Sequence, residues 1–205
     1  MGRVVVTGMG VISALGNNAA ENLAGLRSCR TGIGEARFLD SRYADELLFG
    51  EAKLSNEELR KEFAYPNQTG LTRTELLAFM AFREAVANSG LSEEELRSFD
   101  TALLSGTTVG GMVEMEAIYA DANTNTTPSP FVNSYRSGAH TLQLVKAFGL
   151  HGYTDTMNTA CSSSANSIML GARMIKAGKA KRAIVGGVDS LAKYTVNGFN
   201  SLQIF

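Results

Sequence analysis

The sequence predicts an α/β fold in which helices cover the faces of a mainly parallel sheet. Three observations lead to this prediction: short β-branched or aliphatic runs end in glycines, longer amphipathic segments follow them, and the two kinds alternate along the chain. The 205 residues are 44% hydrophobic, which is enough for a substantial core, and they show neither an internal repeat nor an interdomain linker. We therefore expect residues 1–205 to form a single domain.

The first element is expected to be a buried strand at Val4–Val6, because successive β-branched residues are typical of a strand covered on both faces. Gly8 and Gly10 follow this run. A dinucleotide-binding turn would need a third glycine at the place where Ser13 stands. We therefore expect these glycines to form a strand-end turn with positive φ.

Caps and periodicity predict the later elements. Thr72 and Glu75 have the spacing of a capping box, and the apolar residues after them indicate a buried helix that ends at Gly90. Residues 28–70 lack periodicity and are expected to run over the surface, and residues 121–130 are expected to form a loop. Further helices are expected over residues 17–26, 112–120, 137–148 and 165–177, and strands over 101–105, 153–158 and 182–185.

Composition argues against several classes of function. The 19 Lys and Arg residues against 20 Asp and Glu give a net charge of −1, so a nucleic-acid partner is not expected. No stretch approaches the ~20 apolar residues of a membrane span. Cys29 and Cys161 cannot build a disulfide framework, which indicates a reducing, cytoplasmic setting. His140 and His151 are too few for most zinc sites, so no metal is expected and both are interpreted as structural.

Cys161 stands between a predicted strand and a predicted helix, where the positive end of the helix dipole stabilises a thiolate. The small residues beside it leave room for a substrate, and its own N–H can face a developing oxyanion. The alternative is that Cys161 is a small buried hydrophobe, and local context leaves both interpretations open. Cys29 lacks this context and is interpreted as an incidental thiol.

The segment Thr159–Ser163, with Cys161 at its centre, resembles the nucleophile motif of β-ketoacyl-[acyl-carrier-protein] synthases. These are condensing enzymes of the thiolase superfamily. The resemblance extends over nearly all of the chain, because further landmarks of the family follow in register. They are Val4–Ser13, Gly106–Gly111, Phe148–Gly152 and Ile184–Asp189.

The resemblance implies a thiolase-like fold and a two-step acyl transfer. Cys161 would take an acyl group from the phosphopantetheine of an acyl carrier protein and then condense it with the carbanion of a decarboxylated malonyl thioester. No cofactor of the chain's own is implied, because the phosphopantetheine arrives on the carrier. Val109 and Phe199 are implied as walls of the acyl pocket, and the strand before Cys161 as the place of homodimer pairing.

In the family, two histidines of the second half assist decarboxylation, whereas this sequence stops at Phe205. The chain is therefore expected to be the N-terminal half only, with the second half absent, and to be inactive in condensation unless a partner chain supplies the rest. His140 and His151 precede Cys161 and are not carried over from the family. The alternatives are a non-catalytic dimer partner related to chain-length factors and a cysteine acyl hydrolase that uses one of these histidines. Fatty acid, polyketide and aryl-polyene synthesis all stay open.

Overall fold

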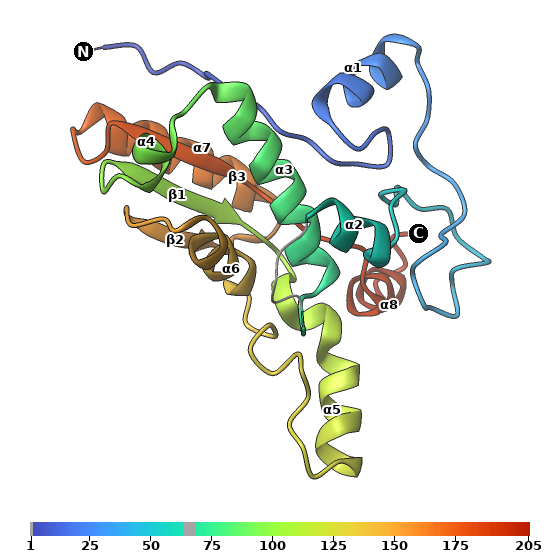
Figure 1. The fold of residues 1–205 in the computed structure, drawn as a ribbon. Helices are drawn as coiled ribbons and strands as arrows, with labels where there is room; N and C mark the ends of the chain where they lie inside the picture. Colours follow the sequence, from blue (N-terminus) through green and yellow to red (C-terminus); the bar gives the residue numbers. More distant parts are fainter. Residues whose placement is uncertain (1, 64–68) are drawn as a thin grey trace.

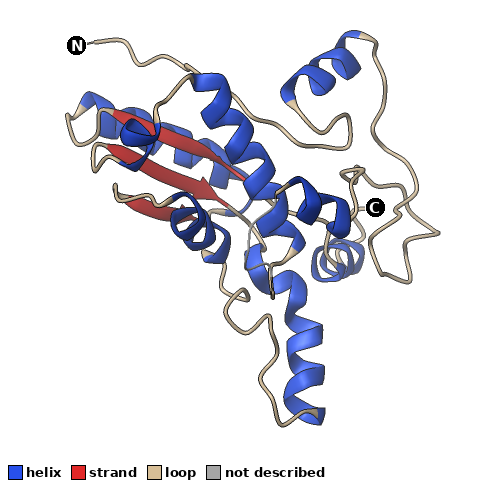
Figure 2. Cartoon of the chain, viewed as in Figure 1, coloured by secondary structure: helices blue, strands red, loops and turns tan. Residues whose placement is uncertain are grey.

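The computed structural model describes residues 2–63 and 69–205. Within those ranges the strands form one parallel sheet in the order β2-β1-β3 (Figures 1 and 2). The central strand is buried along its whole length, including its polar residues Thr101 and Ser105. The prediction of a mainly parallel sheet is confirmed. The strands are β1 (Thr101–Gly106), β2 (Thr154–Met157) and β3 (Arg182–Gly187).

Three helices cover this sheet: α3 (Arg73–Ser89), α6 (Ala139–Phe148) and α7 (Ser163–Lys176) (Figure 1). Successive residues of β1 serve opposite faces, as the alternation of a strand demands. Leu103 joins the core formed with α3 and α6, whereas Leu104 faces α7 at Gly171. The molecule therefore has helices on both sides of a short parallel sheet, as predicted.

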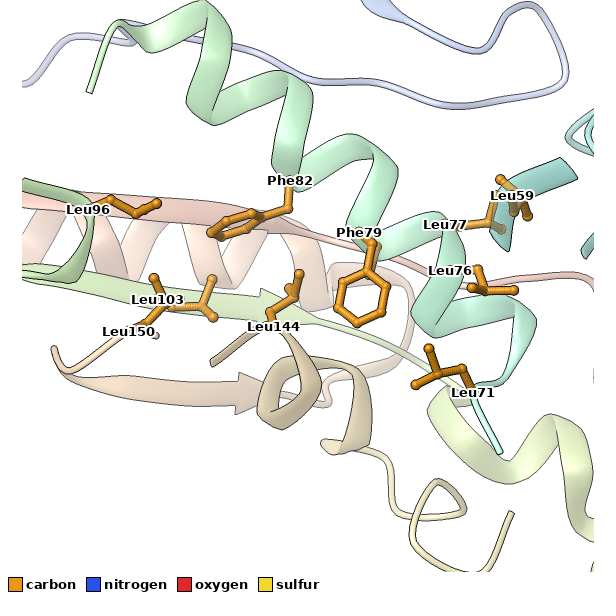
Figure 3. Packing of buried hydrophobic residues seen from close by; sticks show 11 residues of the cluster. Leu59, Leu71, Leu76, Leu77, Phe79, Phe82, Leu96, Leu103, Leu144 and Leu150 are labelled. Carbon is orange, nitrogen blue, oxygen red and sulfur yellow. The ribbon is translucent and has the colours of Figure 1, made fainter. Parts of the chain in front are cut away.

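The main core lies between α3, α6 and β1 (Figure 3). Phe79 of α3 is fully buried, and its ring stacks on Phe63 with 4.2 Å between the centroids. Phe82 meets Phe148 of α6 at 4.4 Å. Burial of these large rings is the main stabilising contribution of α3.

The ends of α3 follow the sequence signals. Thr72 and Glu75 form the expected capping box, in which each side chain bonds the backbone N–H of the other. Gly90 ends the helix with φ of 70°, a left-handed conformation that glycine adopts without strain. The helix is buried over most of its first half, but Arg83, Ala87 and other residues of its second half are exposed. The prediction of a buried helix therefore holds for the first half of α3 and not for the second.

Residues 28–70 contain more structure than expected. α2 (Asn56–Glu62) begins at Ser55, which forms a second capping box with Glu58. Leu59 of this helix is fully buried in the main core, so the segment does not simply run over the surface. The Ser55-x-x-Glu58 spacing was the signal for this helix. Part of the expected surface run, residues 64–68, lies outside the described residues.

The helix expected at residues 17–26 is present as α1 (Ala19–Arg27). The helix expected at residues 112–120 is present as α5 (Met115–Thr124), which continues into the expected loop. The last helix, α8, has no counterpart among the expected elements. No helix in the described ranges combines the length and the apolar character needed to cross a membrane. The remaining helical elements are α4 (Glu93–Arg97), η1 (Gly110–Glu114), η2 (Ala160–Ser162) and α8 (Lys193–Ser201).

The expectation of a buried strand at Val4–Val6 was wrong. These residues form no strand in the described structure, and the side chains of Val5 and Val6 are 63% and 86% exposed. The segment that follows them is tied to a helix rather than to a neighbouring strand. The Met9 N–H donates to the side chain of Asn88 in α3. β-Branched residues favour an extended backbone, but only a partner strand makes that backbone part of a sheet.

The glycines at Gly8 and Gly10 also differ from expectation, because neither has a positive φ. They are needed for close approach instead. A Cβ on Gly10 would collide with the carbonyl oxygen of Ala81, and one on Gly8 would lie 2.6 Å from the carbonyl oxygen of Ala85. The absence of side chains lets the N-terminal segment lie directly against α3.

Candidate active site at Cys161

Cys161 lies at the junction between β2 and α7, as the sequence predicts. β2 ends at Met157, and the single turn of η2, which contains Cys161, leads directly into α7 at Ser163. The cysteine is exposed to solvent. An incoming electrophile can therefore reach its Sγ atom without any rearrangement of the described chain.

The N-terminus of α7 lies two residues after this thiol in the chain. Helix N-termini present N–H groups that lack partners within the helix and carry the positive end of the helix dipole. The N-cap residue, Ser162, makes no side-chain capping bond in the described structure. The Ser163 N–H already donates to the Ala160 carbonyl within η2, so what α7 offers an anion beside Cys161 is the positive end of its dipole.

Ala160, directly before the cysteine, has φ of 51°. This left-handed conformation costs a residue with a Cβ roughly 1–2 kcal/mol. Its carbonyl oxygen is held in place by two hydroxyl donors, Ser163 Oγ at 2.7 Å and Thr108 Oγ1 at 3.2 Å. The backbone at Cys161 is therefore fixed in a conformation that an isolated chain would rarely adopt.

The loop after β1 contacts the segment around Cys161 directly. The Thr107 N–H donates to the Met157 carbonyl at 3.0 Å. The Asn158 side-chain amide donates to the Thr108 carbonyl at 3.2 Å. Ser163 Oγ also lies 3.2 Å from the Thr107 carbonyl oxygen, so its single hydrogen is shared between this carbonyl and that of Ala160. Three hydrogen bonds thus join the loop after β1 to the junction between β2 and α7.

Two strand-end glycines allow α7 to begin so close to the sheet. A Cβ on Gly106 would lie 2.5 Å from the carbonyl carbon of Ser163 and 2.6 Å from the Ser164 nitrogen. A Cβ on Gly187 would collide with the Ser164 hydroxyl. The first turn of α7 therefore rests on the ends of β1 and β3, where any larger residue would push it away.

The comparisons with known proteins agree with this geometry. The sequence model of the family "Beta-ketoacyl synthase, N-terminal domain" matches residues 1–205 of this chain. The chain belongs to the β-ketoacyl synthase family.

A curated relative of this β-ketoacyl synthase chain is 3-oxoacyl-[acyl-carrier-protein] synthase 1 of Escherichia coli (strain K12). The two are 29% identical over 199 residues, which are 93% of this chain and 48% of the relative. The chain thus spans about half the length of the curated relative it matches.

Solved structures show the same fold. The ishigamide ketosynthase/chain length factor superposes with a TM-score of 0.87 at 23% identity, over 97% of this chain and 50% of that one. A type II polyketide synthase acyl-carrier protein in complex with its ketosynthase bound to the hexaketide (AntDE:AntF) gives a TM-score of 0.74 at 16% identity. That match covers 98% of this chain and 48% of that one. The thiolase-like fold expected of this family is therefore confirmed.

The two histidines of this synthase chain have structural surroundings. His140 is buried, and its Nδ1 lies 3.2 Å from the Ser137 carbonyl oxygen, which can only accept. Nε2 is then the acceptor for the Ser105 hydroxyl, at 2.8 Å. Burial lowers the pKa of His140 to about 4, so it is neutral at pH 7. His151 is exposed, and its ring lies 5.8 Å from that of Phe99.

Val109 and Phe199, the implied pocket walls, lie in different parts of the described structure. Val109 is buried in the loop after β1, whereas Phe199 is 42% exposed on α8. A hollow of 170 Å³ beside Arg73 and another of 650 Å³ beside Tyr43 include neither residue, nor Cys161. Their role in acyl binding stays a prediction. No group of three His, Cys, Asp or Glu that could hold a metal occurs in the described part of the chain.

The contacts that support Cys161 could not be read from local patterns. Thr108 and Asn158 are 50 residues apart in sequence, and neither belongs to a motif with a chemical role of its own. What brings them together is the pairing of β1 with β2. These contacts could have been predicted only from the register between β1 and β2, and a single sequence does not reveal that register.

Proposed function

We propose that this chain carries the nucleophile of a condensing enzyme, and that Cys161 is the acyl acceptor. The observation that carries the proposal is an exposed thiol between β2 and the N-terminus of α7. In the first step Sγ attacks the carbonyl carbon of an acyl-carrier thioester. The tetrahedral oxyanion collapses, the acyl group stays on Cys161, and the carrier thiol leaves.

The second step forms the carbon–carbon bond. A malonyl-carrier thioester loses carbon dioxide, and its enolate carbon attacks the acyl carbon on Cys161. The thiolate leaves, and the carrier holds a 3-oxoacyl chain that is two carbons longer. In both steps the residues of this chain hold the thiol beside the N-terminus of α7, where the positive end of the helix dipole favours the developing negative charge.

The proposed partners follow from the relatives. The E. coli relative is named as acting on an acyl-carrier-protein substrate, and one solved neighbour contains a carrier protein with its ketosynthase. Acyl and malonyl thioesters of a carrier protein are therefore the proposed substrates, in fatty acid or polyketide synthesis. The chain needs no bound cofactor of its own in this proposal, because phosphopantetheine arrives on the carrier. A homodimer or a partner chain, in a cytoplasmic location, belongs to the same proposal.

Mass spectrometry of the full protein after incubation with an acyl-carrier thioester tests the acceptor role. We expect one acyl group on the peptide that contains Cys161, and none in a Cys161→Ala variant. Cys29→Ala is the matched control and should be acylated like the wild type. Acylation of Cys29 instead, or equal acylation of the Cys161→Ala variant, would contradict the proposal.

A chain-length-factor-like partner without catalysis is the second candidate. One observation favours it, namely that a ketosynthase/chain length factor superposes with a TM-score of 0.87. The same incubation separates the candidates, because a non-catalytic partner would take up no acyl group. A cysteine hydrolase would release free acid, but neither histidine is hydrogen-bonded to Cys161 among the described residues.

A further inference from the structure

Asp189 follows the end of β3 by two residues, at the same edge of the sheet as Cys161. β3 pairs with β1 so that Gly187 lies opposite Gly106, and the loop of Thr107–Gly110 begins directly after that pair. Because the strands are parallel, the segments that leave their carboxyl ends lie side by side (Figure 1). The Asp189 side chain extends from one of these segments to the next.

Four donors of the loop after β1 converge on this carboxylate. Oδ1 accepts from the Thr107 hydroxyl at 2.8 Å, from the Val109 N–H at 3.0 Å and from the Gly110 N–H at 3.4 Å. Oδ2 accepts from the Thr108 N–H at 2.8 Å. Bonds to an ionised acceptor are stronger than bonds between neutral groups. The Asp189 side chain thus forms hydrogen bonds with four consecutive residues, Thr107–Gly110.

The backbone on either side of Asp189 is itself held. The Val188 N–H donates to the Gly106 carbonyl at 2.9 Å, which continues the ladder between β3 and β1. The Ser190 hydroxyl lies 2.8 Å from the Thr74 hydroxyl of α3, and this contact is buried. The carboxylate is therefore attached to a fixed support and can determine the position of the loop.

The loop in turn contacts the residues around the candidate nucleophile. Thr108 donates through its hydroxyl to the carbonyl of Ala160, the left-handed residue directly before Cys161. The carbonyl groups of Thr107 and Thr108 accept from the side chains of Ser163 and Asn158. A continuous set of hydrogen bonds leads from Asp189 through the loop to both sides of Cys161.

We propose that Asp189 is a positioning residue for Cys161, a role that rests on the acyl-acceptor function proposed above. It acts through the loop of Thr107–Gly110, which it holds against the strand–helix junction. A carboxylate suits the role because it presents only acceptors to these four donors. An amide at the same place would turn an NH₂ group toward one of them.

The test uses the full protein with the variants Asp189→Ala and Asp189→Asn. Asp100→Asn is the matched control, because Asp100 forms an ion pair with Lys181 at the opposite end of β1 and β3, away from the Cys161 segment. Two reactions of Cys161 are compared in each protein. Acyl transfer from a carrier thioester requires an oriented thiol and stabilisation of an oxyanion, whereas alkylation by iodoacetamide requires a thiolate and access to it but forms no oxyanion.

We expect Asp189→Ala to slow acylation of Cys161 about 10- to 100-fold, as a misplaced reacting group does. Alkylation should change little, Asp189→Asn should be intermediate, and Asp100→Asn should behave like the wild type. Equal acylation rates in the wild type and Asp189→Ala would overturn the inference. So would a parallel loss of acylation and alkylation, which indicates general disruption rather than positioning.

Hydrogen exchange gives a second readout that does not depend on activity. In Asp189→Ala, peptides that cover residues 107–110 and 158–163 should both lose protection, while Asp100→Asn should change neither. Unchanged exchange at 158–163 would overturn the inference even if the loop itself loosened. If wild-type Cys161 takes up no acyl group, the proposed function fails, and hydrogen exchange alone decides whether Asp189 holds the segment.

Discussion

Cys161 and Cys29 lie at opposite ends of helices. Cys161 directly precedes Ser162, the N-cap residue of α7, whereas Cys29 follows Ser28, the C-cap residue of α1, and has φ of 52°. Both are exposed, so access to solvent does not distinguish them. Because the helix dipole is positive at the N-terminus and negative at the C-terminus, only the first position favours a thiolate.

We predict that iodoacetamide labels Cys161 about 2- to 5-fold faster than Cys29 in the folded protein. The estimate takes a dipole contribution of about 0.3–1 kcal/mol at each helix end and allows for the lower nucleophilicity of a more stable thiolate. Peptide mapping after limited alkylation measures the ratio. The difference should vanish in urea, and equal labelling of the folded protein would show that α7 does not activate the thiol.

Gly106→Ala should destabilise the protein by about 1–3 kcal/mol, because the new methyl group would overlap backbone atoms of Ser163 and Ser164. Gly186→Ala is the matched control in the neighbouring strand, where a Cβ meets nothing within 4 Å. That substitution should be neutral or stabilise by roughly 0.4–1 kcal/mol. Urea unfolding measures both, and similar values for the two variants would show that α7 is not held by close approach to Gly106.

Stability should depend on pH through His140. Its pKa is lowered by burial from 6.5 to about 4, so the folded state favours the neutral ring. The contribution of neutral His140 to the free energy of unfolding is therefore complete above pH 6.5, and it is lost as the pH falls from 6.5 toward 4. Across that pH range, the free energy of unfolding of the wild type should fall by about 3 kcal/mol more than that of a His140→Gln variant. Urea titrations at several pH values measure this, and parallel pH profiles would place His140 in contact with water.

Ser92 forms a further capping box with Glu95 at the start of α4, and it should contribute less to stability than the capping box at Thr72. Thr72→Ala removes the cap of a 17-residue helix from a buried site and should cost about 2 kcal/mol. Ser92→Ala removes the cap of the 5-residue α4 at the surface and should cost roughly 0.5 kcal/mol. Thermal or urea unfolding of both variants provides the comparison. A larger effect at Ser92 would show that burial does not strengthen the cap of α3.

The sequence predicted those features whose signals lie within a few neighbouring residues. The start of α3 at Thr72, its end at Gly90 and the place of Cys161 between a strand and a helix all depend on residues close to one another. The family resemblance added the nucleophile motif and the thiolase-like fold. Together these were sufficient to locate the candidate nucleophile from the sequence.

Long-range contacts were not predictable in the same way. Val4–Val6 has the composition of a strand, but only a neighbouring strand could have made it one. Asp189 belongs to a recognised family landmark, yet its bonds to the loop after β1 span 79 to 82 residues. Hydrogen bonds of that kind depend on the strand order, which a single sequence does not reveal.

The strand order β2-β1-β3 has a consequence for the timing of folding. The loop after β1 can receive support from Asp189 only when β3 has paired with β1, and β3 is the last of the three strands to leave the ribosome. Contacts between residues so distant in sequence close late, because the intervening chain must first give up its conformational freedom. During synthesis, Cys161 is therefore present in the growing chain before the hydrogen bonds from the loop after β1 to Asp189 can form.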